Sequence, residues 1–198
     1  ATEPSEISLT LDYGLSYFHY ENDLVNLELS GLNWYGSSVA SGSSQPISTN
    51  TPNAKENVDG SIELKMKGYS TSGSLNTFHS IEVHINEPNS NKIGNTISWS
   101  GNGTRTISTS ILSQDLNRAE NTFFINNISS DNNSSPYVDY LAIKYGIKLT
   151  FNSDKMEFFS PIKNTNVRFN FASIFSSNVL ALDITNPGLP KIIEIIDN

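Results

Sequence analysis

Three histidines, His19, His79 and His84, are the only imidazole bases in this chain of 198 residues, which contains no cysteine. Nucleophilic catalysis needs a Ser, Thr or Cys beside a base that a third group orients. None of the histidines has a serine in a glycine-flanked turn near it in sequence. His79 alternates with Ile81 and Val83, which is the pattern of a core position on a strand. The sequence therefore predicts no catalytic residues.

Two groups of side chains have the chemistry of metal ligands. Glu82 and His84 share one face of a predicted strand, but a zinc site needs further ligands that the sequence does not identify. Residues 129–139 gather oxygen donors of the kind that Ca²⁺ prefers, namely Asp131, Asn132, Asn133 and Asp139. The alternative is an ordinary Asn-rich turn before a strand. We expect no cofactor, with calcium at this loop as the exception to test.

Aromatic side chains next to Ser, Asn and Gly suggest a sugar-binding surface. A half-exposed ring can stack on a pyranose while amides and carboxylates bind its hydroxyl groups. The candidates for ligand binding are Trp34, Tyr35, Trp99 and Tyr137. The alternative is that these rings close the ends of the fold, and we expect Trp99 to be buried because it continues the face of Ile97.

The elements that must position these residues show a period of two, which is typical of strands with one buried face. The longest run, residues 141–151, places Leu141, Ile143 and Tyr145 on one side, and Gly146 could mark a bulge. Residues 36–60 are predicted to be a long polar loop, and only residues 110–120 look helical. The pattern predicts an all-β fold, an antiparallel β-sandwich of jelly-roll, galactose-binding-like type with about eleven strands.

Charge and hydropathy exclude several partners. Twelve basic and 20 acidic residues give a net charge of −8, and there is no basic run, so nucleic acid is not expected as a partner. No segment approaches the roughly 18 apolar residues that a membrane span needs, so membrane insertion is not expected either. The length suits one sandwich module over residues 1–198. Residues 191–198 form an apolar run, so we expect an excised part of a longer protein whose last strand belongs to a following domain.

Three segments together resemble a known family. They are residues 137–151, residues 179–190 (Val-Leu-Ala-Leu-Asp-Ile-Thr-Asn-Pro-Gly-Leu-Pro) and residues 32–36 (Leu-Asn-Trp-Tyr-Gly). The chain resembles the region that precedes the peptidase domain in gingipain-type cysteine peptidases, particularly the PorU-like sortases of type IX secretion. It departs from that pattern at Leu182, where the family usually has Trp, and at Ser37, where Glu is common. Residues 81–125 also look like a galactose-binding jelly roll, which implies a fold and not a ligand.

The resemblance implies a non-catalytic, extracytoplasmic module at the outer membrane or cell surface of a Bacteroidetes-type bacterium. Its partners would be the downstream peptidase domain of the same chain or other cell-surface proteins. The catalytic Cys and His would then lie beyond Asn198. Two alternatives stay open: a carbohydrate-binding module of a surface glycan system, which would bind glycan, and a structural spacer in an adhesin.

Overall fold

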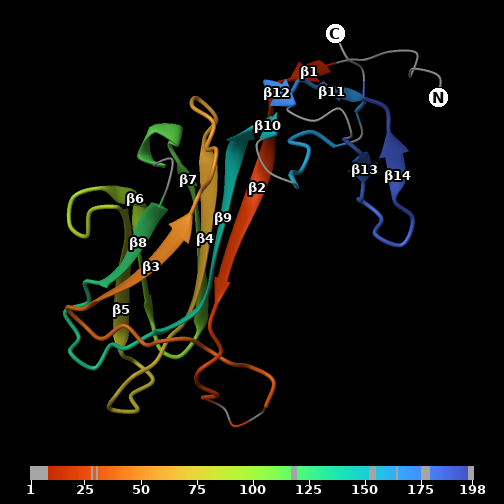
Figure 1. Cartoon of the computed structure of the whole chain (residues 1–198). Helices are drawn as coiled ribbons and strands as arrows, with labels where there is room; N and C mark the ends of the chain where they lie inside the picture. Colours follow the sequence, from red (N-terminus) through yellow and green to blue (C-terminus); the bar gives the residue numbers. More distant parts are fainter. Residues whose placement is uncertain are drawn as a thin grey trace. The chain divides into compact units, whose positions relative to one another are not determined.

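The computed structural model describes residues 9–27, 29, 31–116, 120–151, 155–163, 165–174 and 179–195. They cluster into two compact units. One unit comprises residues Leu15–Ile147, and the other combines Ala1–Gly14 with Lys148–Asn198 (Figure 1). Among the described residues, no helix is long and apolar enough to cross a membrane.

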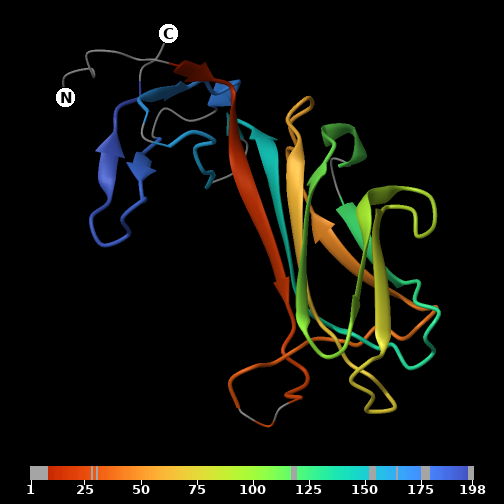
Figure 2. The same ribbon diagram turned by 180° about the vertical axis from the view of Figure 1, so that it is seen from behind.

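The larger unit holds two four-stranded sheets that face each other in both views (Figures 1 and 2). The first has the order β2-β9-β4-β7 and the second the order β3-β8-β5-β6. The pairs of β4 with β7 and β9, of β3 with β8, and of β5 with β6 and β8 are antiparallel. The strands are β2 (Tyr13–Glu21), β3 (Ser44–Asn50), β4 (Gly60–Lys67), β5 (Phe78–Ile85), β6 (Lys92–Ser100), β7 (Thr104–Ile111), β8 (Glu120–Asn127) and β9 (Tyr137–Lys148).

The core lies between the inward faces of these sheets. Alternate residues of each strand are buried, so that the apolar side chains meet and the polar ones face outward. β9, in the middle of its sheet, contributes Leu141, Ile143 and Tyr145, and the other central positions are Ile62, Leu64, Met66, Ile81, Val83, Ile85, Phe123 and Ile125. The predicted all-β antiparallel sandwich is confirmed.

Residues 36–60 are not one polar loop, as the sequence suggested, because β3 lies within them and pairs along its length with β8. Its pattern is weak because only Ile47 and Thr49 point into the core, while Pro46 suits an edge strand that needs few amide donors. Between β2 and β3, Val25 and Tyr35 form an isolated antiparallel bridge. Of the segment 110–120, residues 117–119 lie outside the described residues, and the described part contains one 3-10 turn, η1 (Ser113–Asp115).

Gly146 lies where residues 54–58 approach β9. A Cβ atom there would lie 2.5 Å from Cγ1 of Val58. The glycine therefore permits residues 54–58 to pack against β9, and the Lys55 amide donates to the Gly146 carbonyl at 2.8 Å. At Asp139 the register of β9 with β4 slips by one residue.

The smaller unit consists of short strand pairs. β1 (Leu9–Leu11) runs parallel to β11 (Val167–Phe169), and β10 (Thr150–Phe151) runs parallel to β12 (Ser173–Ile174). The Phe158 ring packs edge-on against Phe169 and Phe171, with centroid distances of 4.9 and 6.0 Å.

The last two described strands form an antiparallel hairpin of β13 (Ala181–Asp183) and β14 (Lys191–Ile193). Leu182 lies opposite Ile192, and these side chains are 45% and 76% exposed. Leu180 and Ile184 extend the same face and are also exposed. Of the predicted strand 191–198, residues 196–198 lie outside the described residues, and the assignment of one module to residues 1–198 stays a prediction.

The packing of β9 makes a first testable prediction. Leu141→Ala should lower the free energy of unfolding by about 2–5 kcal/mol, because it opens a cavity where the side chain is fully buried. Leu75→Ala is the matched control, since Leu75 is 71% exposed, and its effect should stay within about 0.5 kcal/mol. Urea unfolding followed by tryptophan fluorescence measures both, and equal effects would contradict this assignment of the core.

Candidate functional site

A β-bulge turns two successive side chains of β9 to the outer face of its sheet. Lys65 of β4 pairs with Tyr140, while the next residue, Met66, pairs with Val138, so Asp139 is the extra residue. Val138 and Leu141 remain buried on either side. Asp139 and Tyr140 therefore both bond to outward-facing side chains of β4, Asp139 to Lys65 and Tyr140 to Glu63.

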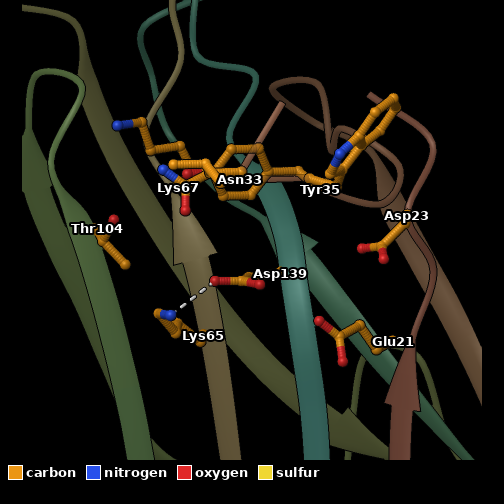
Figure 3. A pocket seen from close by; sticks show the side chains of 10 residues that line it. Glu21, Asp23, Asn33, Tyr35, Lys65, Lys67, Thr104 and Asp139 are labelled. Carbon is orange, nitrogen blue, oxygen red and sulfur yellow. Dashed lines mark ion pairs between the residues drawn. The ribbon is translucent and has the colours of Figure 1, made fainter. Parts of the chain in front are cut away.

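A pocket of about 350 Å³ lies beside this bulge (Figure 3). β2 supplies Glu21, the segment after it supplies Asp23, β4 supplies Lys65 and Lys67, and β7 supplies Thr104. β9 supplies Asp139, and residues 32–35 complete the lining with Leu32, Asn33, Trp34 and Tyr35. The pocket thus joins the outer face of one sheet to the segment that follows β2.

Backbone hydrogen bonds hold the Trp34-Tyr35-Gly36 segment in place. Tyr35 exchanges hydrogen bonds of 2.9 Å with Val25, and the Gly36 amide donates to the Val138 carbonyl at 2.7 Å. A Cβ at Gly36 would lie 3.3 Å from that carbonyl, so glycine suits this close approach. Because neighbouring side chains point in opposite directions, Tyr35 is buried and Trp34 is 44% exposed.

The lysine and carboxylate side chains of the pocket lie on different sides of Asp139. Nζ of Lys65 lies 2.9 Å from Oδ2 of Asp139, and this hydrogen bond raises the pKa of Lys65 although burial opposes it. Figure 3 shows the carboxylates of Glu21 and Asp23 on the other side of Asp139 from Lys65. The carboxylates of Glu21 and Asp23 therefore line one wall of the pocket, while the charges of Lys65 and Asp139 at its centre compensate each other.

The outer face continues from the pocket along β2 and β9 as a strip of rings and carboxylates. The ring of His19 lies 5.3 Å from that of Tyr140, and Tyr17 is exposed two residues further along β2. The Tyr140 hydroxyl donates to the Glu63 carboxylate, and this bond, together with burial, raises the pKa of Tyr140 to about 12. Such a surface offers both stacking faces and hydrogen-bond acceptors.

The structure brings together Trp34 and Tyr35 but places the other two predicted ring residues elsewhere. Trp99 is 5% exposed and packs against His79 with a centroid distance of 4.9 Å, so it offers no face to a sugar. Tyr137 is half-buried in an edge-on contact with Tyr69. Neither residue lines the pocket.

His79 is a core residue, as its alternation with Ile81 predicts. Its Nδ1 lies 2.8 Å from Oγ of Ser134, and burial lowers the pKa of the ring. The Gly101 carbonyl opposes that shift, yet Nε2 makes no hydrogen bond of normal geometry. The environment favours a neutral imidazole with a structural role.

The predicted calcium ligands do not converge. Asp131 accepts hydrogen bonds from the amides of Phe78 and Asn133 at 3.1 and 3.0 Å, which lower its pKa and order its own loop. Asn132 is exposed, and Oδ1 of Asn133 accepts from Thr71. Asp139 instead bonds to Lys65. Among the described residues, no three His, Cys, Asp or Glu side chains are placed to hold a metal ion.

Glu82 and His84 do pair, with 3.3 Å between Oε2 and Nε2. Glu82 also accepts from Thr96 at 2.7 Å and from Lys92 at 3.1 Å, and these bonds outweigh burial and lower its pKa to about 2. The carboxylate is therefore the centre of a polar network on the outer face of the second sheet.

Sequence reasoning missed most of the pocket. Glu21, Asp23, Lys65, Lys67 and Thr104 come from three strands and a loop, whose proximity depends on the sheet order. One usable signal was present: Glu63, Lys65 and Lys67 alternate with the buried Ile62, Leu64 and Met66, which marks a charged outer face.

The fold and this surface define the chain as a β-sandwich module. No family model matches the sequence, and no curated protein matches it. Among solved structures, dimeric latent PorU from Porphyromonas gingivalis matches with a TM-score of 0.63 and 15% identity. That match covers 81% of this chain and 15% of the PorU chain, so the module spans a small part of PorU's length. The predicted likeness to PorU therefore holds at the level of the fold.

Two carbohydrate-binding modules also match over 65% of this chain. A CBM36 module in complex with calcium and xylotriose has a TM-score of 0.42 and 13% identity, with 98% of that module covered. The C-terminal CBM6 of the laminarinase LamC from Zobellia galactanivorans has a TM-score of 0.40 and 14% identity, also with 98% covered. TM-scores near 0.4 do not establish a shared topology.

The two tryptophans should respond oppositely to truncation. Trp99→Ala should lower the free energy of unfolding by about 3–5 kcal/mol, because a buried ring is lost. Trp34→Ala should change it by no more than about 0.5 kcal/mol, because that ring is half in solvent. Denaturant unfolding tests both variants, and a large loss in Trp34→Ala would mean that this ring is a structural cap.

The lowered pKa of Glu82 predicts a pH dependence of stability. A carboxylate whose pKa is depressed from 4.5 to about 2 stabilises the fold above pH 4.5, and this contribution is lost as pH falls through that window. Glu82→Gln should cost about 1–2 kcal/mol at pH 7, and this cost should shrink steadily as the pH falls from 4.5 to about 2. Glu157→Gln, at a solvent-exposed pair with Lys155, is the control. A cost in Glu82→Gln that is independent of pH would refute the electrostatic origin.

Proposed function

We propose that this chain is a non-catalytic β-sandwich module of a PorU-like protein, located outside the cytoplasm at the outer membrane or cell surface. Its role is to pack against the peptidase domain of the same polypeptide or to bind another cell-surface protein. The observation that carries the proposal is the fold shared with PorU over 81% of the chain. The family resemblance of residues 137–151 and 179–190 points in the same direction.

Side-chain chemistry supports the non-catalytic part of the proposal. The chain has no cysteine to serve as the nucleophile of a cysteine peptidase. Each histidine has another role: His79 is buried against Trp99, His84 is paired with Glu82, and His19 lies on the surface beside Glu21 at 3.2 Å. Catalysis in the longer protein would therefore depend on residues outside this module.

The β13–β14 hairpin supports the packing role. A two-stranded hairpin is marginally stable in water without a partner surface. This one nevertheless exposes Leu180, Leu182, Ile184 and Ile192 on a single face. Burying each such side chain is worth about 1.5–3 kcal/mol, so a domain docked on this face would gain favourable free energy from each of them. Leu182 stands where the gingipain-type family usually has Trp, which is also an apolar anchor.

The test uses the natural polypeptide that carries this module together with its downstream domain. Leu182→Glu combined with Ile192→Glu should increase proteolysis between the domains by about tenfold or more, because charges replace an apolar contact. The same pair of substitutions in the isolated 198-residue chain should leave its melting temperature unchanged. Limited proteolysis and calorimetry measure the two effects.

Leu75→Glu provides the control, because Leu75 is equally exposed but lies in the sandwich unit. It should leave the proteolysis rate of the long polypeptide unchanged. If the hairpin variant of the long polypeptide is also cleaved between the domains at the rate of the native protein, the hairpin does not hold the domains together, and the packing role fails.

Carbohydrate binding is a second candidate, favoured by the pocket below Trp34. A ring that is 44% exposed stands next to carboxylate, amide and hydroxyl groups in a concave site, which is the chemistry that recognises a pyranose. A screen of the isolated module on a glycan array tests this function. Binding should be lost in Trp34→Ala and retained in Tyr69→Phe, a ring that packs against Tyr137 away from the pocket.

A further inference from the structure

The charged side chains that line the Trp34 pocket differ in whether they form an ion pair. Lys65 forms an ion pair with Asp139, with 2.9 Å between Nζ and Oδ2, and Lys67 lines the pocket as well. Glu21 engages His19 through Oε2 alone. Within the part of the chain that the structure describes, Asp23 forms no ion pair. The β2 side of the pocket therefore presents two carboxylates that lack a strong cationic partner.

A pocket lined by an indole and carboxylates favours a positively charged ligand. The face of a tryptophan attracts an ammonium group through its quadrupole, and carboxylates accept hydrogen bonds from the same group. Trp34, Glu21 and Asp23 share the pocket. An acidic ligand is disfavoured there, since the protein as a whole carries a net charge of −8.

The remaining lining suits the rest of a sugar ring. Asn33 and Thr104 are neutral groups that can donate to and accept from hydroxyls. A volume of about 350 Å³ accommodates a ring-sized ligand and exceeds what a single ammonium group requires. The strip of Tyr17, His19 and Tyr140 leads away from the pocket along the sheet and offers room for further sugar units.

We propose that the pocket binds an amino sugar that carries a free ammonium group, with the indole of Trp34 stacked on the pyranose and the ammonium held by Asp23 and Glu21. This inference rests on the second candidate function, carbohydrate binding, and gives it a ligand class. It does not depend on the hairpin or on the packing role.

The experiment compares two trisaccharides that differ in whether their amino groups are free, and so positively charged, or N-acetylated and neutral. The glucosamine trimer should quench the fluorescence of Trp34 and bind at least tenfold more tightly than the N-acetylglucosamine trimer. Trp99 is buried and should contribute little to the signal. Asp23→Asn should markedly reduce this preference, whereas Glu87→Gln, which changes an exposed carboxylate in the β5–β6 turn, should retain it. Added salt should weaken the binding of the glucosamine trimer and leave the binding of the N-acetylglucosamine trimer unchanged, because salt screens only the charge interaction.

The outcomes separate the ligand class from the function. Equal, Trp34-dependent binding of both trimers would overturn the ammonium assignment and leave a glycan-binding module. Absence of binding to these trimers and to a glycan array would overturn both. A trilysine peptide that binds as tightly as the glucosamine trimer would overturn the sugar assignment in favour of a lysine side chain. Circular dichroism of Asp23→Asn verifies that the variant is folded.

Discussion

The outer face of the first sheet depends on one extra residue in β9. Without the bulge, strict alternation would send either Asp139 or Tyr140 into the core, where an unpaired carboxylate costs several kcal/mol. The bulge instead lets both side chains face outward. There Asp139 forms an ion pair with Lys65, and the Tyr140 hydroxyl donates to Glu63 of the same neighbouring strand. Val138 and Leu141 can then return to the core on either side.

The same strand joins the pocket to the core. β9 lies between β2 and β4, and its backbone at Val138 accepts the Gly36 amide that anchors the Trp34 segment. The position of the exposed indole is thus set by a strand whose other face is among the most buried surfaces of the protein. Rigid placement by a packed strand is what a binding surface requires of its first contacts.

Sequence patterns predicted the parts of the fold that follow from alternation. Leu141, Ile143 and Tyr145 are buried because a long strand in the middle of a sheet repeats every two residues, and Trp99 is buried for the same reason. β3 was missed because Ser44–Asn50 carries a single aliphatic inward residue, Ile47.

The pocket was missed for a different reason. Glu21, Lys65 and Asp139 are far apart in sequence and meet only through the order of the strands and the slip at Asp139. Alternation within one strand reports which face is buried and carries no information on which strands are neighbours. The assignment of Asp139 to a calcium loop shows the same limit, because nearness in sequence to Asp131 does not bring the two carboxylates to one site.

The second sheet ends in two strands that are poor templates for polymerisation. β3 carries Pro46, which has no amide hydrogen to offer a neighbouring chain, and β6 departs from its regular register with β5 between Ile97 and Ile93. Copies crowded side by side would therefore not join edge to edge into a continuous sheet through these strands. The edges of this sheet therefore disfavour edge-to-edge association of copies at high local density, independently of the ligand or partner that the module binds.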